Sequence, residues 1–176
     1  MSHAGSGTAA AYVLIFGIVQ SLSSAVPGAV SESPLLHILL KGKARVLVKD
    51  AIYGALRRLA KPQCQRLFTD FADPAGHPLS ETLSAWGKTP VEALAALYFV
   101  EGDESVECHA DGTRGAFTVP GNRVIYVCGT RFTDRFARRI AGEILLIHEL
   151  LHALGLGENP PTSAQITDAV RIRCGN

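Results

Sequence analysis

The spacing of apolar and polar positions predicts mainly helices in the first half of the chain. Apolar residues recur at helical spacing over 43–60. Lys61-Pro62 ends that helix, because the residue before a proline disfavours the helical conformation. The stretch LSETLSAWG predicts a short helix closed by Gly87. Thr89-Pro90-Val91-Glu92 is a capping box, which predicts a further helix through about Tyr98.

The pattern then changes to one typical of strands. SVECHA, GAFTV and RVIYVCG are rich in residues that favour strands, and Pro120-Gly121-Asn122 predicts a turn between the last two. These segments predict a small antiparallel sheet of two or three strands.

Two more helices follow the predicted sheet. Thr133 is a candidate cap for a long helix from about Asp134 to Leu154, which Gly155 would end. The segment 162–165 is a second capping box and predicts a last helix to about Arg173. The order of elements therefore predicts a compact α+β domain, mostly helical, with a small antiparallel sheet and a central helix.

Composition and the N-terminal pattern bound the class of protein. The 176 residues are 47% apolar and 19% charged, which indicates one globular domain. The net charge of +1 offers no footprint for nucleic acid or an anionic membrane. The uncharged apolar run 9–20 is shorter than the ~20 residues that span a bilayer, so we expect no stable membrane anchor. It suits a signal peptide over 1–29, although no Lys or Arg precedes it, and an amphipathic element is the alternative. A spacer over 30–42 and a domain over 43–176 would follow.

The cysteines also indicate a secreted or periplasmic protein. Their number is even, and none forms a C-x-x-C pair. Two disulfides are therefore expected, with three possible connectivities. The preferred pairing is Cys108–Cys128 in the sheet region and Cys64–Cys174 between the ends of the domain.

The predicted helix 134–154 carries the main candidate chemistry. It is apolar on nearly every side, which is typical of a helix in a domain core, yet it includes His148, Glu149 and His152. Buried ionisable groups cost several kcal/mol unless they are paired or bind a metal.

The spacing of these residues predicts a metal site. His148 and His152 are four residues apart, on one face of the helix, so both imidazoles can reach one ion. Glu149 lies about 100° around the helix. This is the H-E-x-x-H arrangement of zinc hydrolases, in which one zinc ion activates water and Glu149 would act as general base.

The stretch HELLHALGLGE resembles the long signature of the metzincin metallopeptidases, within the wider zincin group. The resemblance implies that Gly155 turns the chain so that a third ligand meets the zinc ten residues after the first histidine. That position holds Glu158, where the family has histidine or aspartate, and Asp168 on the last helix is the alternative ligand. The family also has a methionine turn beneath the metal. The only methionine here is Met1, so no subfamily is assigned.

The resulting hypothesis is a secreted zinc-dependent peptidase acting on a peptide or protein substrate. The resemblance implies that the substrate adds to an edge strand, either 123–128 or its hairpin partner. Two alternatives stay open, namely an inactive binding or structural domain and an amidase acting on a non-protein substrate. The oxyanion stabiliser also stays open, with candidates among Tyr98, Tyr126, Arg171 and Arg173. His77 and His109 are expected at the surface, and His3 and His37 have no ligand-like partners nearby in the sequence. The sequence does not predict an oligomeric state.

Overall fold

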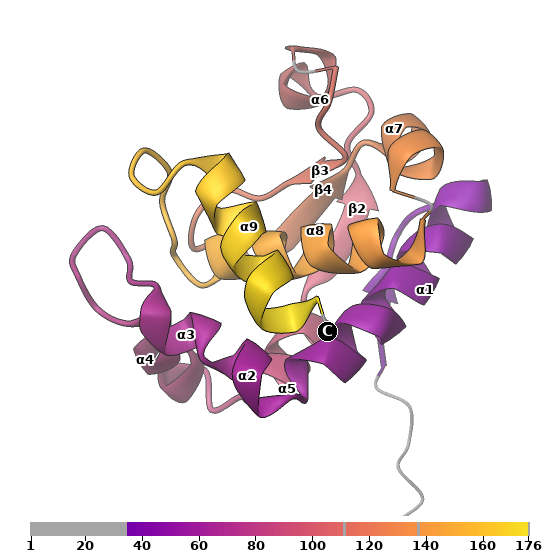
Figure 1. The fold of residues 1–176 in the computed structure, drawn as a ribbon. Coiled ribbons are helices and arrows are strands. Elements are labelled where there is room, and N and C mark those ends of the chain that lie inside the picture. Colours follow the sequence, from indigo (N-terminus) through magenta and orange to yellow (C-terminus); the bar gives the residue numbers. More distant parts are fainter. Residues whose placement is uncertain (1–34, 111, 137, 176) are drawn as a thin grey trace, which may run out of the picture. The chain divides into compact units, whose positions relative to one another are not determined.

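A computed structural model describes residues 35–110, 112–136 and 138–175 of the chain. The predicted signal peptide and the first part of the spacer, residues 30–34, lie outside the described residues, whereas the rest of the spacer is described and includes strand β1 (His37–Ile38). The helices are α1 (Gly42–Leu59), α2 (Pro62–Gln65), α3 (Leu67–Asp70), α4 (Leu79–Ala85), α5 (Pro90–Ala95), α6 (Val106–Ala110), α7 (Gly129–Arg135), α8 (Arg139–Ala153) and α9 (Ser163–Cys174). With a small sheet, they form the mostly helical α+β domain that the sequence predicts (Figure 1).

The sheet is mixed, so the prediction of an antiparallel sheet was wrong. Its strands are β1 (His37–Ile38), β2 (Tyr98–Glu101), β3 (Ala116–Phe117) and β4 (Val124–Val127), in the order β1-β2-β4-β3. Strands β1, β2 and β4 are parallel, and β3 pairs with β4 in the antiparallel sense. The predicted hairpin around Pro120-Gly121-Asn122 is therefore present, at one edge of a sheet whose other pairs are parallel.

Two local predictions failed, the first because strands from distant parts of the chain pair with the segment and the second because a helix cap was overlooked. The helix expected to reach Tyr98 ends at Ala95, and the aromatic and β-branched residues after it form β2, between β1 and β4. The segment SVECHA is helix α6 rather than a strand. The Ser105 hydroxyl accepts the backbone N–H of Cys108 and stabilises the start of this helix.

The long helix expected from 134 to 154 is two helices. Helix α7 ends at Arg135 and α8 begins at Arg139. Gly142 permits this break, because a Cβ there would lie 2.9 Å from the Phe136 carbonyl oxygen. Thr133 lies inside α7, where its hydroxyl donates to the Thr130 carbonyl, so its predicted role as a cap was wrong.

The elements with strong local signals are confirmed. Helix α1 covers the predicted range almost residue for residue, and both capping boxes, at Thr89 and at Thr162, make their reciprocal hydrogen bonds. Gly87 and Gly155 follow the ends of α4 and α8 with positive φ, as glycines after helices commonly do.

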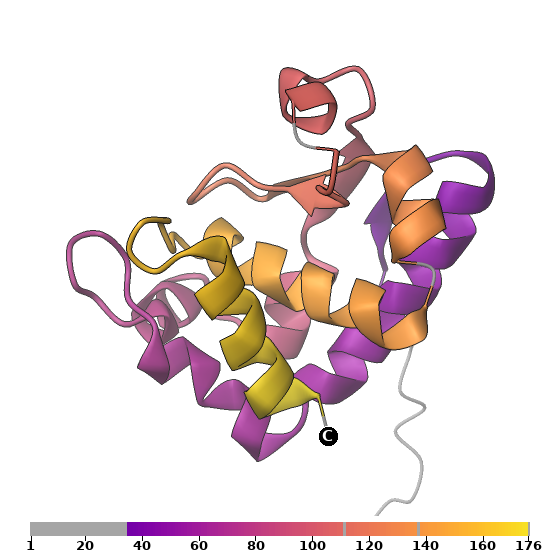
Figure 2. The ribbon, with the colours of Figure 1, turned by 45° about the horizontal axis from the view of Figure 1, so that its top comes forward.

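Helix α8 is the centre of the core. It packs against α1, α9, β3 and β4. In the view of Figure 1, α9 lies in front of α8 and the strands lie behind it, and in Figure 2, where the top is turned forward, the strands lie above α8. Most apolar residues of α8 are buried, whereas Ile140 is exposed at one end. No helix among the described residues has the length and apolar character to span a membrane.

Both disulfides have the preferred pairing. Cys64 of α2 is bonded to Cys174 at the end of α9, and Cys108 of α6 is bonded to Cys128 directly after β4. The first bond ties the C-terminal helix to the helical half of the domain. The second ties the α6 excursion to the sheet.

A buried ion pair joins the same parts of the fold. The Arg58 guanidinium of α1 pairs with the Glu143 carboxylate of α8, and the two side chains are 13% and 4% exposed. Arg58 also donates to the Cys174 carbonyl of α9. Gly54 leaves the space for this carboxylate, because a Cβ there would lie 2.1 Å from Glu143 Oε1.

Removing the Glu143 carboxylate is expected to destabilise the domain. In Glu143→Ala, Arg58 stays buried without its partner, and the free energy of unfolding should fall by about 3–5 kcal/mol. The matched control is Asp70→Ala, which removes the Arg173–Asp70 pair, with side chains 36% and 40% exposed. This control should lose about 0–1 kcal/mol. If denaturant unfolding shows that both variants lose the same free energy of unfolding, the stabilising role of the buried Arg58–Glu143 pair is contradicted.

The two disulfides should differ in their contribution to stability. The Cys64–Cys174 bond spans 110 residues and Cys108–Cys128 spans 20. Chain entropy then gives roughly 5 kcal/mol for the first and roughly 3 kcal/mol for the second. Thermal unfolding of the two double Cys→Ala variants checks this order, which a larger loss for the shorter loop would reverse.

Candidate metal centre

Helix α8 carries three ionisable side chains into the core. His148, Glu149 and His152 are 4%, 4% and 5% exposed. Their helix neighbours on the other faces are fully buried leucine and isoleucine residues, which hold α8 in a fixed rotation. The two histidines are one turn apart on a common face, and their Nε2 atoms lie 3.0 Å apart.

The turn after α8 brings a carboxylate back to the histidines. Gly155 has φ +112°, a conformation that L side chains rarely adopt, and the chain reverses there. Glu158 Oε1 then lies 3.3 Å from His152 Nε2 and 3.9 Å from His148 Nε2. The turn after α3 lies next to this reversal, since a Cβ added at Gly155 would lie 3.6 Å from Asp73 Cβ and one added at Gly157 would lie 3.5 Å from Pro74 Cγ. Glu158 therefore joins the histidines because of the turn that Gly155 allows.

The other predicted candidate for third ligand lies apart from this group. Asp168 is exposed on α9 and forms an ion pair with Arg171, 3.4 Å away. It does not line the cleft beside the histidines. Of the two carboxylates, the structure brings Glu158 to the imidazoles.

The group of three fits a zinc ion by its spacing. The circle that passes through His148 Nε2, His152 Nε2 and Glu158 Oε1 has a radius of about 2.0 Å. This radius equals the length of a zinc–nitrogen or zinc–oxygen bond. Two imidazole nitrogens and one carboxylate oxygen are a ligand set that zinc accepts.

The protonation of the histidines suits metal binding as well. His152 Nδ1 lies 2.7 Å from the Leu156 carbonyl oxygen, which only accepts, so the proton is on Nδ1 and the lone pair is on Nε2. His148 Nδ1 lies 3.0 Å from the Thr167 hydroxyl. Burial, together with the neighbouring His152, lowers the pKa of His148 to about 3, so this imidazole is neutral at ordinary pH. Neutral imidazole is the form that binds metals.

Glu149 has a different environment from the three ligand candidates. Its Oε2 atom is buried and makes no hydrogen bond with any described residue, and the same holds for the neighbouring Thr118 hydroxyl. Burial raises the pKa of Glu149 to about 8, against the opposing effects of Thr118 and Arg114. A carboxyl group with a pKa near neutrality can both accept and release a proton.

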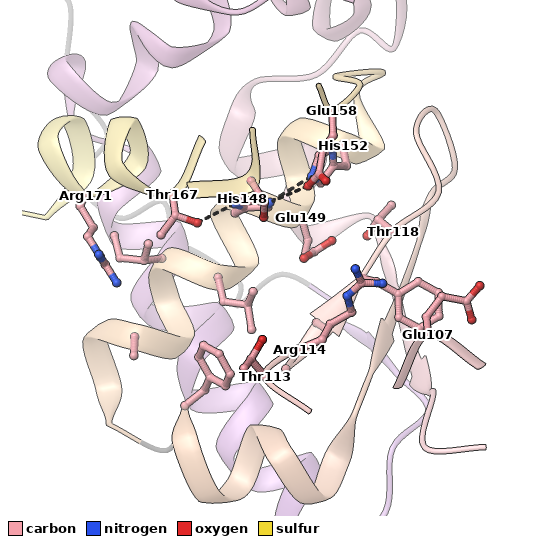
Figure 3. A pocket seen from close by; sticks show the side chains of 18 of the residues that line it. Glu107, Thr113, Arg114, Thr118, His148, Glu149, His152, Glu158, Thr167 and Arg171 are labelled. Carbon is pink, nitrogen blue, oxygen red and sulfur yellow. Dashed lines mark hydrogen bonds and ion pairs between the residues drawn. The ribbon is translucent and has the colours of Figure 1, made fainter. Parts of the chain in front are cut away.

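These residues open into a cleft of about 1100 Å³. One wall is α8, the second is the segment 113–120 that includes β3, and the third is α9. In Figure 3, Glu149 projects into this space between the histidines and Arg114. Beyond the polar centre the cleft is mainly apolar, lined by Phe117, Val119, Phe136, Ile140, Ala141, Ile144 and Leu145.

The strand at the cleft is β3. It has β4 as its neighbour on one side and forms one edge of the described sheet. Strand β4, part of the segment 123–128, lies between β2 and β3 and offers no free edge. The Gly121 N–H donates to the His152 carbonyl, so the hairpin is attached to the end of α8 that carries the candidate ligands.

The other residues singled out in the sequence make contacts outside the group formed by His148, His152 and Glu158. Tyr98 stacks on His37 and Tyr126 stacks on Phe117. Arg173 pairs with Asp70, and Arg171 lines the cleft while paired with Asp168. His77 pairs with Asp73 and His109 contacts the Ser105 carbonyl, as expected of surface residues. His3 lies outside the described residues.

Sequence reasoning missed two threonines and one arginine at the centre. Thr118, Thr167 and Arg114 come from the hairpin and α9, 19 or more positions from the histidine or glutamate beside which they lie. No local pattern marks them, because packing of separate segments brings them to the site. Comparison of the chain with protein-family models, with curated proteins and with solved structures found no match.

Zinc affinity should distinguish the two third-ligand candidates. Removing an outer hydrogen-bond partner of a metal site costs 10–100-fold in affinity, so losing a direct ligand in Glu158→Ala should weaken zinc binding by more than about 100-fold. Asp168→Ala should bind zinc like the wild type. Competition with a chromophoric chelator measures both, and the opposite order would assign the site to Asp168.

Proposed function

We propose that the protein is a zinc-dependent hydrolase of peptide bonds. The observation that carries the proposal is Glu149 Oε2, a buried carboxylate oxygen that makes no hydrogen bond with any described residue and lies beside three converging ligand atoms. Leaving such an oxygen unpaired costs free energy, which stability alone does not explain. A metal site that only stabilised the fold would not need an unpaired, buried carboxylate oxygen beside it.

His148, His152 and Glu158 would hold the ion. Zinc supplies Lewis-acid polarisation of the scissile carbonyl and lowers the pKa of water. The hydrogen bond from His152 Nδ1 to Leu156 O keeps the Nε2 lone pair directed at the common point. Packing on the other faces of α8 fixes the remaining geometry, so the ligands need little rearrangement to bind.

Glu149 would transfer the proton. In peptide hydrolysis the attacking water must lose a proton and the leaving amine must gain one. Glu149 projects into the cleft beside the ligands. A zinc ion held there would favour the ionised form of Glu149, and its unpaired Oε2 could then accept the proton and donate it to the amine nitrogen. The apolar residues that line the rest of the cleft would limit bulk water around that proton once a substrate fills the cleft.

The cleft offers a seat for an extended peptide. Strand β3 presents the backbone of a sheet edge along one wall, and a peptide can add there by strand pairing. The apolar lining opposite, on α8, suits side chains of such a peptide.

Export of the protein is part of the proposal. Two disulfides stabilise a small domain in oxidising compartments, whereas cytosolic thiols are kept reduced. They support a secreted or periplasmic location, which the apolar run 9–20 would direct.

The test compares zinc content and cleavage in the same variants. Wild-type protein should carry about one zinc and cleave members of a broad peptide library. Glu149→Gln should retain zinc and lose about 100–10,000-fold in rate, the usual contribution of a general base. Glu81→Gln, an exposed carboxylate on α4 away from the cleft, is the matched control and should cleave like the wild type.

Other outcomes would assign other functions. Zinc without Glu149-dependent cleavage of any peptide contradicts the peptidase and favours a binding domain. Cleavage of non-peptide amides but of no peptide identifies an amidase. Zinc retained in His148→Ala/His152→Ala removes the metal centre from the proposal.

A further inference from the structure

The outer nitrogens of the two histidines have chemically different partners. His152 Nδ1 faces the Leu156 carbonyl at 2.7 Å, and a carbonyl oxygen can only accept a hydrogen bond. His148 Nδ1 faces the Thr167 hydroxyl at 3.0 Å, and a hydroxyl can either donate or accept. The proton of His152 is therefore fixed on Nδ1, whereas His148 has a partner that accommodates both tautomers (Figure 3).

The Nε2 atoms of the two rings, which face each other, favour different tautomers of His148 with and without a cation. If both rings carry their proton on Nδ1, two Nε2 lone pairs face each other across 3.0 Å. A cation between them makes this arrangement favourable, but without a cation the lone pairs repel each other. His148 removes the repulsion between the two rings, while staying neutral, if it carries its proton on Nε2 and donates it to His152 Nε2. Glu158 Oε1, 3.9 Å from His148 Nε2, then faces this N–H rather than a second lone pair. His148 Nδ1 then needs a donor, which the Thr167 hydroxyl supplies by rotating about its C–O bond.

Thr167 is held firmly enough for this role. The capping box at Thr162 and Gln165 fixes the start of α9, one turn before Thr167. The Cys64–Cys174 disulfide and the hydrogen bond from Arg58 to the Cys174 carbonyl fix its end. The hydroxyl can therefore rotate while its position relative to His148 stays constant.

We infer that Thr167 is a positioning residue that lets His148 change tautomer when the metal binds. The inference rests on the proposed metal centre. Without metal, Thr167 donates to His148 Nδ1 and His148 Nε2–H donates to His152. With metal, His148 Nδ1–H donates to Thr167 and both Nε2 lone pairs are free. The ring loses one proton at Nε2 and gains one at Nδ1, so it stays neutral in both states.

Two variants separate this role from simple packing. Thr167→Val keeps the shape of the side chain but removes its hydrogen bond, and we expect about 10–100-fold weaker zinc binding. Thr167→Ser restores the hydroxyl and should restore the affinity. Thr133→Val on α7 is the matched control, since it also removes a threonine hydrogen bond but far along the chain from the centre, and it should bind zinc normally. Equal affinity of Thr167→Val and wild type would overturn the inference.

The tautomers themselves supply a readout that a structural role would not move. Imidazole ¹⁵N NMR at pH 8, above the ordinary histidine pKa of about 6.5, distinguishes protonated from unprotonated ring nitrogens. In chelator-treated wild-type protein, His148 should carry its proton on Nε2 and His152 on Nδ1. After zinc is added, both should carry it on Nδ1. A His148 that keeps one tautomer throughout would also overturn the inference.

The outcomes separate this inference from the proposed function. Zinc binding that depends on Thr167, without cleavage of peptides, contradicts the peptidase and supports the inference. Peptide cleavage together with an unchanged zinc affinity in Thr167→Val supports the peptidase and contradicts the inference about Thr167. Wild-type protein that binds no zinc contradicts both.

Discussion

The desolvation of three ionisable side chains on α8 is the constraint on which the rest of the structure depends. His148, Glu149 and His152 are nearly as buried as the leucines beside them. Burial leaves them little contact with water, so the surrounding protein must supply most of their hydrogen bonds. The Leu156 carbonyl and the Thr167 hydroxyl satisfy the Nδ1 atoms of the histidines, and Glu158 completes a group of three candidate metal ligands. Glu149 Oε2 is left with no partner among the described residues, and the proposal that Glu149 is a general base starts from this exception.

The partners of these side chains come from segments that the fold anchors independently. Helix α9, which supplies Thr167, is tied by a disulfide to α2 and by Arg58 to α1. The hairpin that forms the opposite wall is tied to α8 through Gly121 and the His152 carbonyl. The buried Arg58–Glu143 pair sets α1 against the first turns of α8. The cleft is therefore bounded by elements that each have a separate attachment to the core.

The sequence predicted the features that depend on neighbours in the chain. Both capping boxes, the end of α8 at Gly155 and the range of α1 follow from local hydrogen bonds and helical periodicity, and all four are confirmed. It did not predict β2, because the strand exists only through pairing with β1 and β4, which come from distant parts of the chain. It also missed α6, although the Ser105 cap of this helix is a local signal, and the Cys108–Cys128 disulfide then joins the helix to the sheet.

The sequence by itself determined that two histidines share one helical face and that a glycine follows them, since both depend on fixed helix geometry. The tertiary structure decided which carboxylate meets them. Glu158 approaches because the chain reverses at Gly155, while Asp168 is exposed on α9 and pairs with Arg171. Only the tertiary structure brought Thr167 and Thr118 to the centre. Their positions depend on how α9 and the hairpin pack on α8, and no spacing along the chain encodes that packing.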